Sequence, residues 1–210
     1  MKISFLSGLY CRYPLERAFQ IASLQGYDGI EVWGARPHAY AYDMNEARVA
    51  QILQWKEKYK LETPMYCPEI LMYPYNIPTL DPKERKDTID YLKRSIEVAK
   101  DIGAPRIQMT SGHAGYGTDR KTNFENITNV MRILVEHAEK CEVDIVFEVL
   151  TIMESNTIFL LDDFIDLMSR IGSPRLKGML DTVMPMTNWE TYSEYFEKLG
   201  DKMAYIHFED

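Results

Sequence analysis

Short apolar runs alternate with longer amphipathic stretches along the whole chain. Residues 2–6 (KISFL) predict a first strand, and Leu15–Leu24 predicts a first helix, because its apolar residues recur three and four positions apart. The same pairing repeats to the end of the sequence. We expect further strands at 29–33, 63–66, 106–109, 144–148, 176–181 and 203–207, and further helices at 45–59, 81–103, 123–141, 161–171 and 191–199.

Strands that alternate with helices in this way predict the α/β class, with a parallel sheet covered by helices. Seven strands at a spacing of about 30 residues per unit suit a TIM (β/α) barrel. An open doubly wound sheet is the alternative, but no GxGxxG motif follows the first strand to support it. No linker divides the chain, so we expect one domain over residues 1–210. The chain ends after the seventh strand, and we therefore expect an incomplete barrel that lacks the eighth strand–helix unit.

The net negative charge of the chain argues against some classes of binding partner. A formal charge of −8 and a pI of about 5.1 argue against nucleic acid and anionic membranes, which clustered Lys and Arg side chains bind. No apolar run reaches membrane-spanning length, and the N-terminus lacks a signal-peptide pattern. Cys11, Cys67 and Cys141 are widely spaced and form no CxxC motif, which favours reduced thiols. We expect a cytoplasmic protein.

Three predicted strands end in a side chain that can bind a metal ion: Glu148, Asp181 and His207. In a β/α barrel the carboxyl ends of the strands form the rim where sites are built. Two carboxylates and an imidazole that meet there suit a divalent ion such as Mn, Co, Mg, Ni or Zn. Each residue alone is also compatible with a simpler role, as a helix cap or as an ordinary hydrogen-bonded histidine. Their shared position on one rim favours the metal site.

Six segments between about Tyr27 and the last residue carry a family resemblance: GYDGIEVWGARPHAYAYD, YPYN, HAGYGT, FEVLTIMESNT, SPRLKGMLDTV and FEKLGDKMAYIHFED. Together they are similar to the fructoselysine 3-epimerases. These enzymes are a branch of the ketose 3-epimerase family within the xylose isomerase-like TIM barrels.

The resemblance implies a reaction and a role for single residues. It implies a metal-dependent enzyme that inverts C3 of a ketose or ketosamine, such as fructoselysine, by carboxylate proton transfer through a metal-stabilised enediolate. Glu148 then matches a glutamate that both binds the metal and transfers a proton. Asp181 and His207 match two further metal ligands, and Glu154 matches a glutamate that hydrogen-bonds the sugar.

Three more residues lie in segments that resemble substrate-facing loops of these enzymes: Arg36, His38 and His113. Simpler roles stay open for two of them. Arg36 is also placed to pair with Asp43 in its own loop, and His113 to hydrogen-bond within its glycine-rich segment.

The sequence departs from the family pattern at two points. The family's fourth metal ligand and second catalytic carboxylate is a glutamate on strand eight, to which this chain has no match. We therefore expect the 210-residue chain alone to epimerise poorly. Met184 stands where the psicose and tagatose enzymes carry a sugar-binding histidine, which favours the fructoselysine branch, or some other substrate, over free ketohexoses.

Other functions remain as alternatives on the same barrel. One is an aldose–ketose isomerase or another epimerase, including one for a sugar phosphate. Another is an apurinic endonuclease, which the acidic charge disfavours. A third is a sugar-binding barrel without catalysis. Because such barrels usually associate and the predicted loops are rich in aromatic residues, we expect a homo-oligomer.

Overall fold

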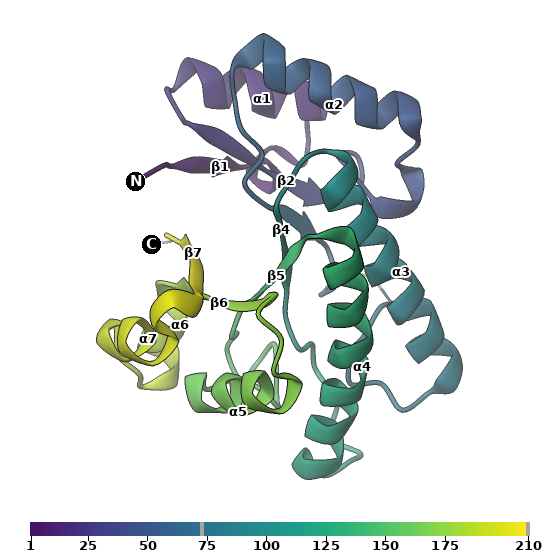
Figure 1. Ribbon diagram of the computed structural model, residues 1–210, viewed down its shortest axis with the longest axis vertical. Helices are drawn as coiled ribbons and strands as arrows, with labels where there is room; N and C mark the ends of the chain where they lie inside the picture. Colours follow the sequence, from purple (N-terminus) through teal and green to yellow (C-terminus); the bar gives the residue numbers. More distant parts are fainter. Residues whose placement is uncertain (72–73, 209–210) are drawn as a thin grey trace.

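Parallel strands follow one another in chain order around a curved sheet, and helices cover its outer side, as the computed structural model shows (Figure 1). The structure describes residues 1–71 and 74–208, so Tyr73 of the YPYN segment and the last two residues lie outside it. Within the described residues the sheet has seven strands: β1 (Ser4–Leu6), β2 (Gly29–Gly34), β3 (Tyr66–Pro68), β4 (Arg106–Met109), β5 (Asp144–Phe147), β6 (Leu176–Asp181) and β7 (Met203–His207). The expected parallel barrel of seven strands is confirmed.

Each strand from β1 to β6 is followed by a helix that returns the chain to the same end of the sheet. The helices are α1 (Leu15–Leu24), α2 (Glu46–Tyr59), α3 (Pro82–Asp101), α4 (Arg120–Cys141), α5 (Leu161–Ile171), α6 (Val183–Asn188) and α7 (Tyr192–Leu199), with 3₁₀ turns at Ser7–Tyr10, Ala41–Asp43 and Gly200–Lys202. Over residues 1–71 and 74–208, only the short α6 and the 3₁₀ turns are additional to the helices that the pattern predicts. No helix in the described part of the chain combines the length and the apolar character needed to cross a bilayer.

The third strand lies later in the sequence than the pattern predicts. It covers Tyr66–Pro68, whereas the apolar pattern indicates 63–66. Chain pairing with β2 already begins at Glu62, whose carbonyl oxygen accepts from the Ile30 N–H at 2.8 Å. Pro64 then interrupts the ladder because proline has no N–H to donate. The regular ladder resumes only at Tyr66.

Helix starts follow from side chains that cap the free backbone N–H groups. Asn45, Asp81 and Asp119 each accept a hydrogen bond from the N–H three residues on, at 2.8–3.0 Å. Pro82 occupies the first turn of α3, where its missing N–H costs nothing. These local signals explain why the helix starts could be predicted to within a few residues.

Two apolar layers hold the barrel together, one on each face of the sheet. The larger layer lies between strands and helices, where Phe147 of β5 stacks on Phe164 of α5 with ring centroids 4.8 Å apart. The smaller layer is inside the barrel and contains Met65, Val146 and Met179.

The inner layer also shows which side chains at the strand ends point into the barrel. Successive residues of a strand point to opposite faces, so residues two apart share a face. Glu148 follows Val146 by two positions, Asp181 follows Met179 by two, and His207 follows Tyr205, which packs against the same inner cluster. The alternation that buries the inner core therefore also turns the polar strand ends inward.

A substitution at Gly34, the last residue of β2, tests the close packing of β2 against β3. A Cβ there would lie 2.6 Å from Tyr66 Cζ and 2.8 Å from the backbone Cα of Pro68. We expect Gly34→Ala to lower the free energy of unfolding by about 1–3 kcal/mol, because backbone and a buried ring must both move. Gly117→Ala is the control, since nothing lies within 4 Å of its Cβ position. Urea unfolding curves that shift equally for both variants would contradict the predicted packing.

Candidate active site

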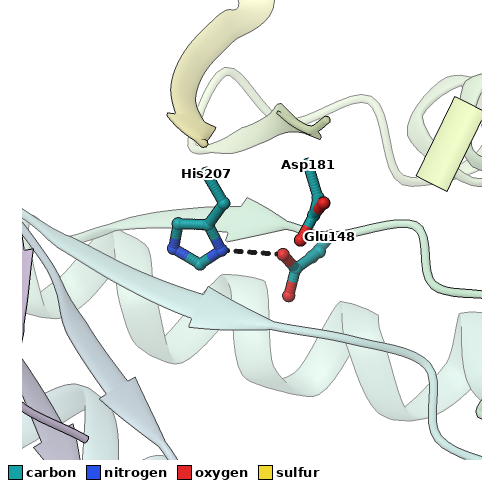
Figure 2. Close-up of side chains that lie close together, drawn as sticks. All are labelled: Glu148, Asp181 and His207. Atoms are coloured by element: carbon teal, nitrogen blue, oxygen red, sulfur yellow. Dashed lines mark hydrogen bonds and ion pairs between the residues drawn. The ribbon is translucent and has the colours of Figure 1, made fainter. Parts of the chain in front are cut away.

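Glu148, Asp181 and His207 converge at the carboxyl ends of three neighbouring strands (Figure 2). One donor atom from each lies within 4.8 Å of the other two. Glu148 is 4% exposed and Asp181 5%, while the His207 side chain is 14% exposed. The pairing of Asp181 with His207 across β6 and β7 places these two directly beside each other. The structure thus brings together the three residues that sequence predicted as metal ligands.

His207 lies between two carboxylates rather than beside one. Its Nδ1 is 2.9 Å from Glu148 Oε1, and its Nε2 is 3.2 and 3.3 Å from the two oxygens of Glu31. Glu31 is 2% exposed and was missed by sequence reasoning. A signal was present, because Glu31 stands alone in the apolar strand GIEVWG, and a charge in a buried strand is almost always paired.

The ionisation of the cluster follows from burial and from these contacts. Burial disfavours the charged imidazolium, but hydrogen bonds to Glu148 and Glu31 outweigh it and raise the pKa of His207 to about 11. Burial raises the pKa of Asp181 above its ordinary value. The Val183 N–H, 2.8 Å from Asp181 Oδ1, partly offsets that rise, and the nearby charge of Glu148 adds to it.

The chemistry of the donor set fits a divalent metal ion. Glu31, Glu148 and Asp181 are three buried carboxylates around one imidazole, so a single proton on the ring cannot balance their charge. Carboxylate oxygens and imidazole nitrogen are the ligands preferred by divalent ions of the first transition series and by Mg²⁺. Glu148, Asp181 and His207 are therefore the residues that would hold such an ion.

Polar residues behind the cluster hold Glu148 in place. The side-chain amide of Gln108 donates to Glu148 Oε2, and the Cys67 thiol donates to Gln108 Oε1 at 2.6 Å. Burial raises the pKa of the Cys67 thiol well above its ordinary value, and the nearby charges of Glu31 and Glu148 raise it further. Cys67 therefore stays protonated and serves as a donor.

Comparison with known proteins places this site in a family. Residues 19–210 match the family model described as a xylose isomerase-like TIM barrel. The chain belongs to this family. The expected similarity to ketose 3-epimerases is also confirmed, because a fructoselysine 3-epimerase of Shigella flexneri is 36% identical over 210 residues, which are 100% of this chain and 76% of the relative. A fructoselysine 3-epimerase of Escherichia coli O157:H7 is 35% identical over the same shares.

Solved structures share the xylose isomerase-like fold at low sequence identity. D-Psicose 3-epimerase from Clostridium cellulolyticum H10, crystallised with D-tagatose, matches with a TM-score of 0.85 and 16% identity, over 100% of this chain and 73% of that one. The apo form of 3-keto-D-glucoside 4-epimerase from E. coli matches with a TM-score of 0.86 and 14% identity, over 100% and 79%. At such identities the likeness shows the fold alone.

Two of the predicted substrate residues of this xylose isomerase-like barrel lie in loops that follow β4 and β5. Glu154 accepts a hydrogen bond from the Thr151 hydroxyl at 2.8 Å, and its charge is close enough to contribute to the raised pKa of Asp181. His113 Nδ1 accepts from the Gly115 N–H at 2.9 Å. Both residues are partly exposed, and their contact with a sugar stays a prediction.

The other two predicted substrate residues already have partners within the protein. Arg36 Nε and Nη2 donate to the two oxygens of Asp43 at 2.6 and 2.7 Å. His38 is 1% exposed, its Nε2 donates to the Tyr13 carbonyl at 2.9 Å, and its Nδ1 is 3.3 Å from the Ser7 hydroxyl. The structure therefore does not place Arg36 and His38 in the metal cluster, and their part in substrate binding stays a prediction.

Metal binding can be tested through its effect on stability. A divalent ion that binds only the folded chain, at 100 times its dissociation constant, adds about 2.7 kcal/mol to the free energy of unfolding. We expect Mn²⁺ to stabilise the wild type in this way and Asp181→Asn to lose most of the increment, because a charged ligand is replaced by a neutral amide. Denaturant unfolding with Mn²⁺ and with EDTA measures the increment for each variant.

Asp166→Asn is the matched control for this experiment. Asp166 is an exposed carboxylate that pairs with Arg170 on α5 and does not belong to the cluster. The increase in unfolding free energy that Mn²⁺ gives this variant should therefore equal that of the wild type. Equal increments in Asp181→Asn and Asp166→Asn would place the ion elsewhere, and no increment in any variant would argue against a metal site.

Proposed function

We propose that this protein is a divalent-metal-dependent sugar epimerase that inverts C3 of a ketose or ketosamine of the fructoselysine type. The observation that carries the proposal is the buried cluster of Glu148, Asp181 and His207 at the carboxyl ends of adjacent strands. Identity of 36% over the full chain to a fructoselysine 3-epimerase supports the choice of reaction and substrate class.

Inversion at C3 begins with loss of a proton from the carbon next to the C2 carbonyl. A divalent ion held by these three residues would supply positive charge to stabilise the negative charge that develops on the sugar oxygens. The proton itself must pass to a base of the protein. Glu148 is the base in this proposal, because its carboxylate lies inside the cluster and is acceptor-only when ionised.

The surroundings of Glu148 support a role in proton transfer. The Gln108 amide donates to Oε2, and His207 Nδ1 faces Oε1, so the carboxylate plane is held from two sides. A fixed carboxylate pays little entropy to reach the geometry for proton abstraction. Inversion further requires that a proton return on the opposite face of the sugar, from a second acid.

Substrate contacts in this proposal come from the loops above the cluster. Glu154 and His113 are partly exposed and offer a carboxylate and a ring nitrogen for sugar hydroxyls. Arg36 and His38 order the loop after β2 through their contacts with Asp43 and Tyr13. From that loop Arg36 would face a charged group of the substrate.

We further propose that the enzyme is cytoplasmic and forms a homo-oligomer. The cysteines Cys11, Cys67 and Cys141 are free thiols, as expected in a reducing compartment such as the cytoplasm. Large apolar side chains such as Met186 and Trp189 are 73% and 97% exposed. Self-association into a homo-oligomer would cover such surface.

Hydrogen exchange at C3 tests the proposed reaction directly. The Mn²⁺-reconstituted protein is incubated with fructoselysine in D₂O, and loss of the C3–H signal, which needs only one base, is followed by proton NMR. The 3-epimer should grow far more slowly than the C3–H signal is lost, because inversion also needs an acid on the opposite face of the sugar. We expect exchange that requires the metal. In Glu148→Gln the exchange rate should fall by about 10²–10⁴-fold, because an amide cannot accept the proton.

The control is Glu62→Gln, which removes an exposed carboxylate paired with Lys2 and should leave the rate unchanged. Equal rates in Glu148→Gln and the wild type would overturn Glu148 as the base. Absence of exchange on fructoselysine, together with exchange on a free ketohexose, would correct the substrate class. Absence of exchange on both would overturn the epimerase proposal.

A further inference from the structure

We infer that Glu31 is a positioning residue for the metal centre. Its carboxylate holds the His207 ring so that Nδ1 is the ligating nitrogen and Nε2 carries the proton. The inference rests on the proposed function in one respect, since it takes a divalent ion to be bound by Glu148, Asp181 and His207. Glu31 itself would not contact the ion.

The geometry of the His207 ring gives its two nitrogens different tasks. Nε2 lies 3.2 and 3.3 Å from the two oxygens of Glu31, whereas Nδ1 lies 2.9 Å from Glu148 Oε1. A metal ion bound to one ring nitrogen displaces the proton there, so the metal-bound ring is neutral and keeps one N–H. An ionised carboxylate only accepts, so Glu31 favours the proton on Nε2. The lone pair then lies on Nδ1, on the side of Glu148.

Glu31 is close to the cluster but stands outside the ligand group. Among the described residues, the group whose donor atoms all lie within 4.8 Å of one another contains Glu148, Asp181 and His207, without Glu31. The imidazole ring lies between Glu31 and Glu148, one carboxylate at each nitrogen. A carboxylate behind a ligating histidine is the arrangement that fixes its tautomer and orientation in many metal sites.

Glu31 is itself held by strands rather than by a loop. It sits in β2 opposite Leu6 of β1, and the side chain is 3% exposed. Burial and the nearby charge of Glu31 raise the pKa of the Tyr205 hydroxyl, and the Ser4 hydroxyl lies 2.5 Å from the Tyr205 oxygen. The ring of His207 is therefore oriented by a contact anchored in β1, β2 and β7.

A second explanation predicts different behaviour. Glu31 would then act only through its negative charge, which attracts any cation nearby. Glu31→Asp separates the two explanations, because aspartate keeps the charge but is one methylene shorter and withdraws from Nε2. Glu31→Gln does the reverse, since it keeps a side chain of equal length with a carbonyl acceptor but loses the charge.

The test measures Mn²⁺ affinity by isothermal titration for the wild type, Glu31→Asp and Glu31→Gln. We expect Glu31→Asp to bind about 10- to 100-fold more weakly than the wild type, the loss typical when the partner behind a ligating histidine is removed. Glu190→Gln is the matched control. Glu190 is a half-buried carboxylate that accepts from the Leu161 N–H and the Tyr195 hydroxyl, and its hydrogen bonds do not reach Glu31 or His207, so the Mn²⁺ affinity of this variant should equal that of the wild type.

A spectroscopic readout on the wild type makes the test independent of how well the variants fold. In Zn²⁺-loaded protein labelled with ¹⁵N-histidine, NMR should show His207 with a protonated Nε2 and a metal-bound Nδ1. In Glu31→Asp we expect the Nε2 proton to exchange faster with water, because its acceptor has withdrawn.

The outcomes separate the inference from the proposed function. Wild-type affinity in Glu31→Asp, or a metal-bound Nε2 in the wild type, would overturn the role of Glu31 while the metal centre stands. No Mn²⁺ or Zn²⁺ binding by the wild type would overturn the metal centre, and the inference with it.

Discussion

The ion-pair contacts of His207 with Glu148 and Glu31 connect the parts of the barrel that the site depends on. Charged groups are buried in proteins only when they are paired, because an isolated charge loses its hydration. Here one imidazole joins β2, β5 and β7, which are far apart in sequence. Hydrogen bonds extend this connection from Glu148 through the Gln108 side chain to the Cys67 thiol.

The cluster of Glu31, Glu148, Asp181 and His207 lies next to an apolar layer inside the barrel, and this layer determines where the polar side chains lie. Met65, Val146 and Met179 fill the inside of the barrel, and the pleat of each strand then brings the next inward residue to the rim. Donors on separate strands thus meet without the cost of ordering a loop. The same arrangement leaves more buried negative charge than the ring can neutralise, which is the physical reason to expect a cation. Because the strands of the curved sheet are parallel and follow chain order, these strand ends lie on the same side of the sheet (Figure 1).

Sequence patterns predicted the fold and the three central residues, and they failed where contacts cross the barrel. Strand and helix positions follow local signals, such as the Asp81–Pro82 helix start, and Asp181 and His207 are the last residues of β6 and β7. Glu31 sits inside a strand, so its partner depends on how β2 and β7 face each other, which no local pattern encodes. The resemblance predicts that His38 lies in a substrate-facing loop, and this stays a prediction; the contacts of its ring with Tyr13 and Ser7 could not be predicted from the sequence. Loop contacts of this kind depend on tertiary packing alone.

Crystals grown with Mn²⁺, with diffraction recorded near the manganese absorption edge, test the central claim most directly. The claim is that one buried donor set, formed by three strand ends, holds the ion. It predicts a single anomalous peak bounded by Glu148, Asp181 and Nδ1 of His207, with Glu31 on the far side of the ring. A peak located away from these three side chains, or no peak in crystals saturated with Mn²⁺, would contradict it.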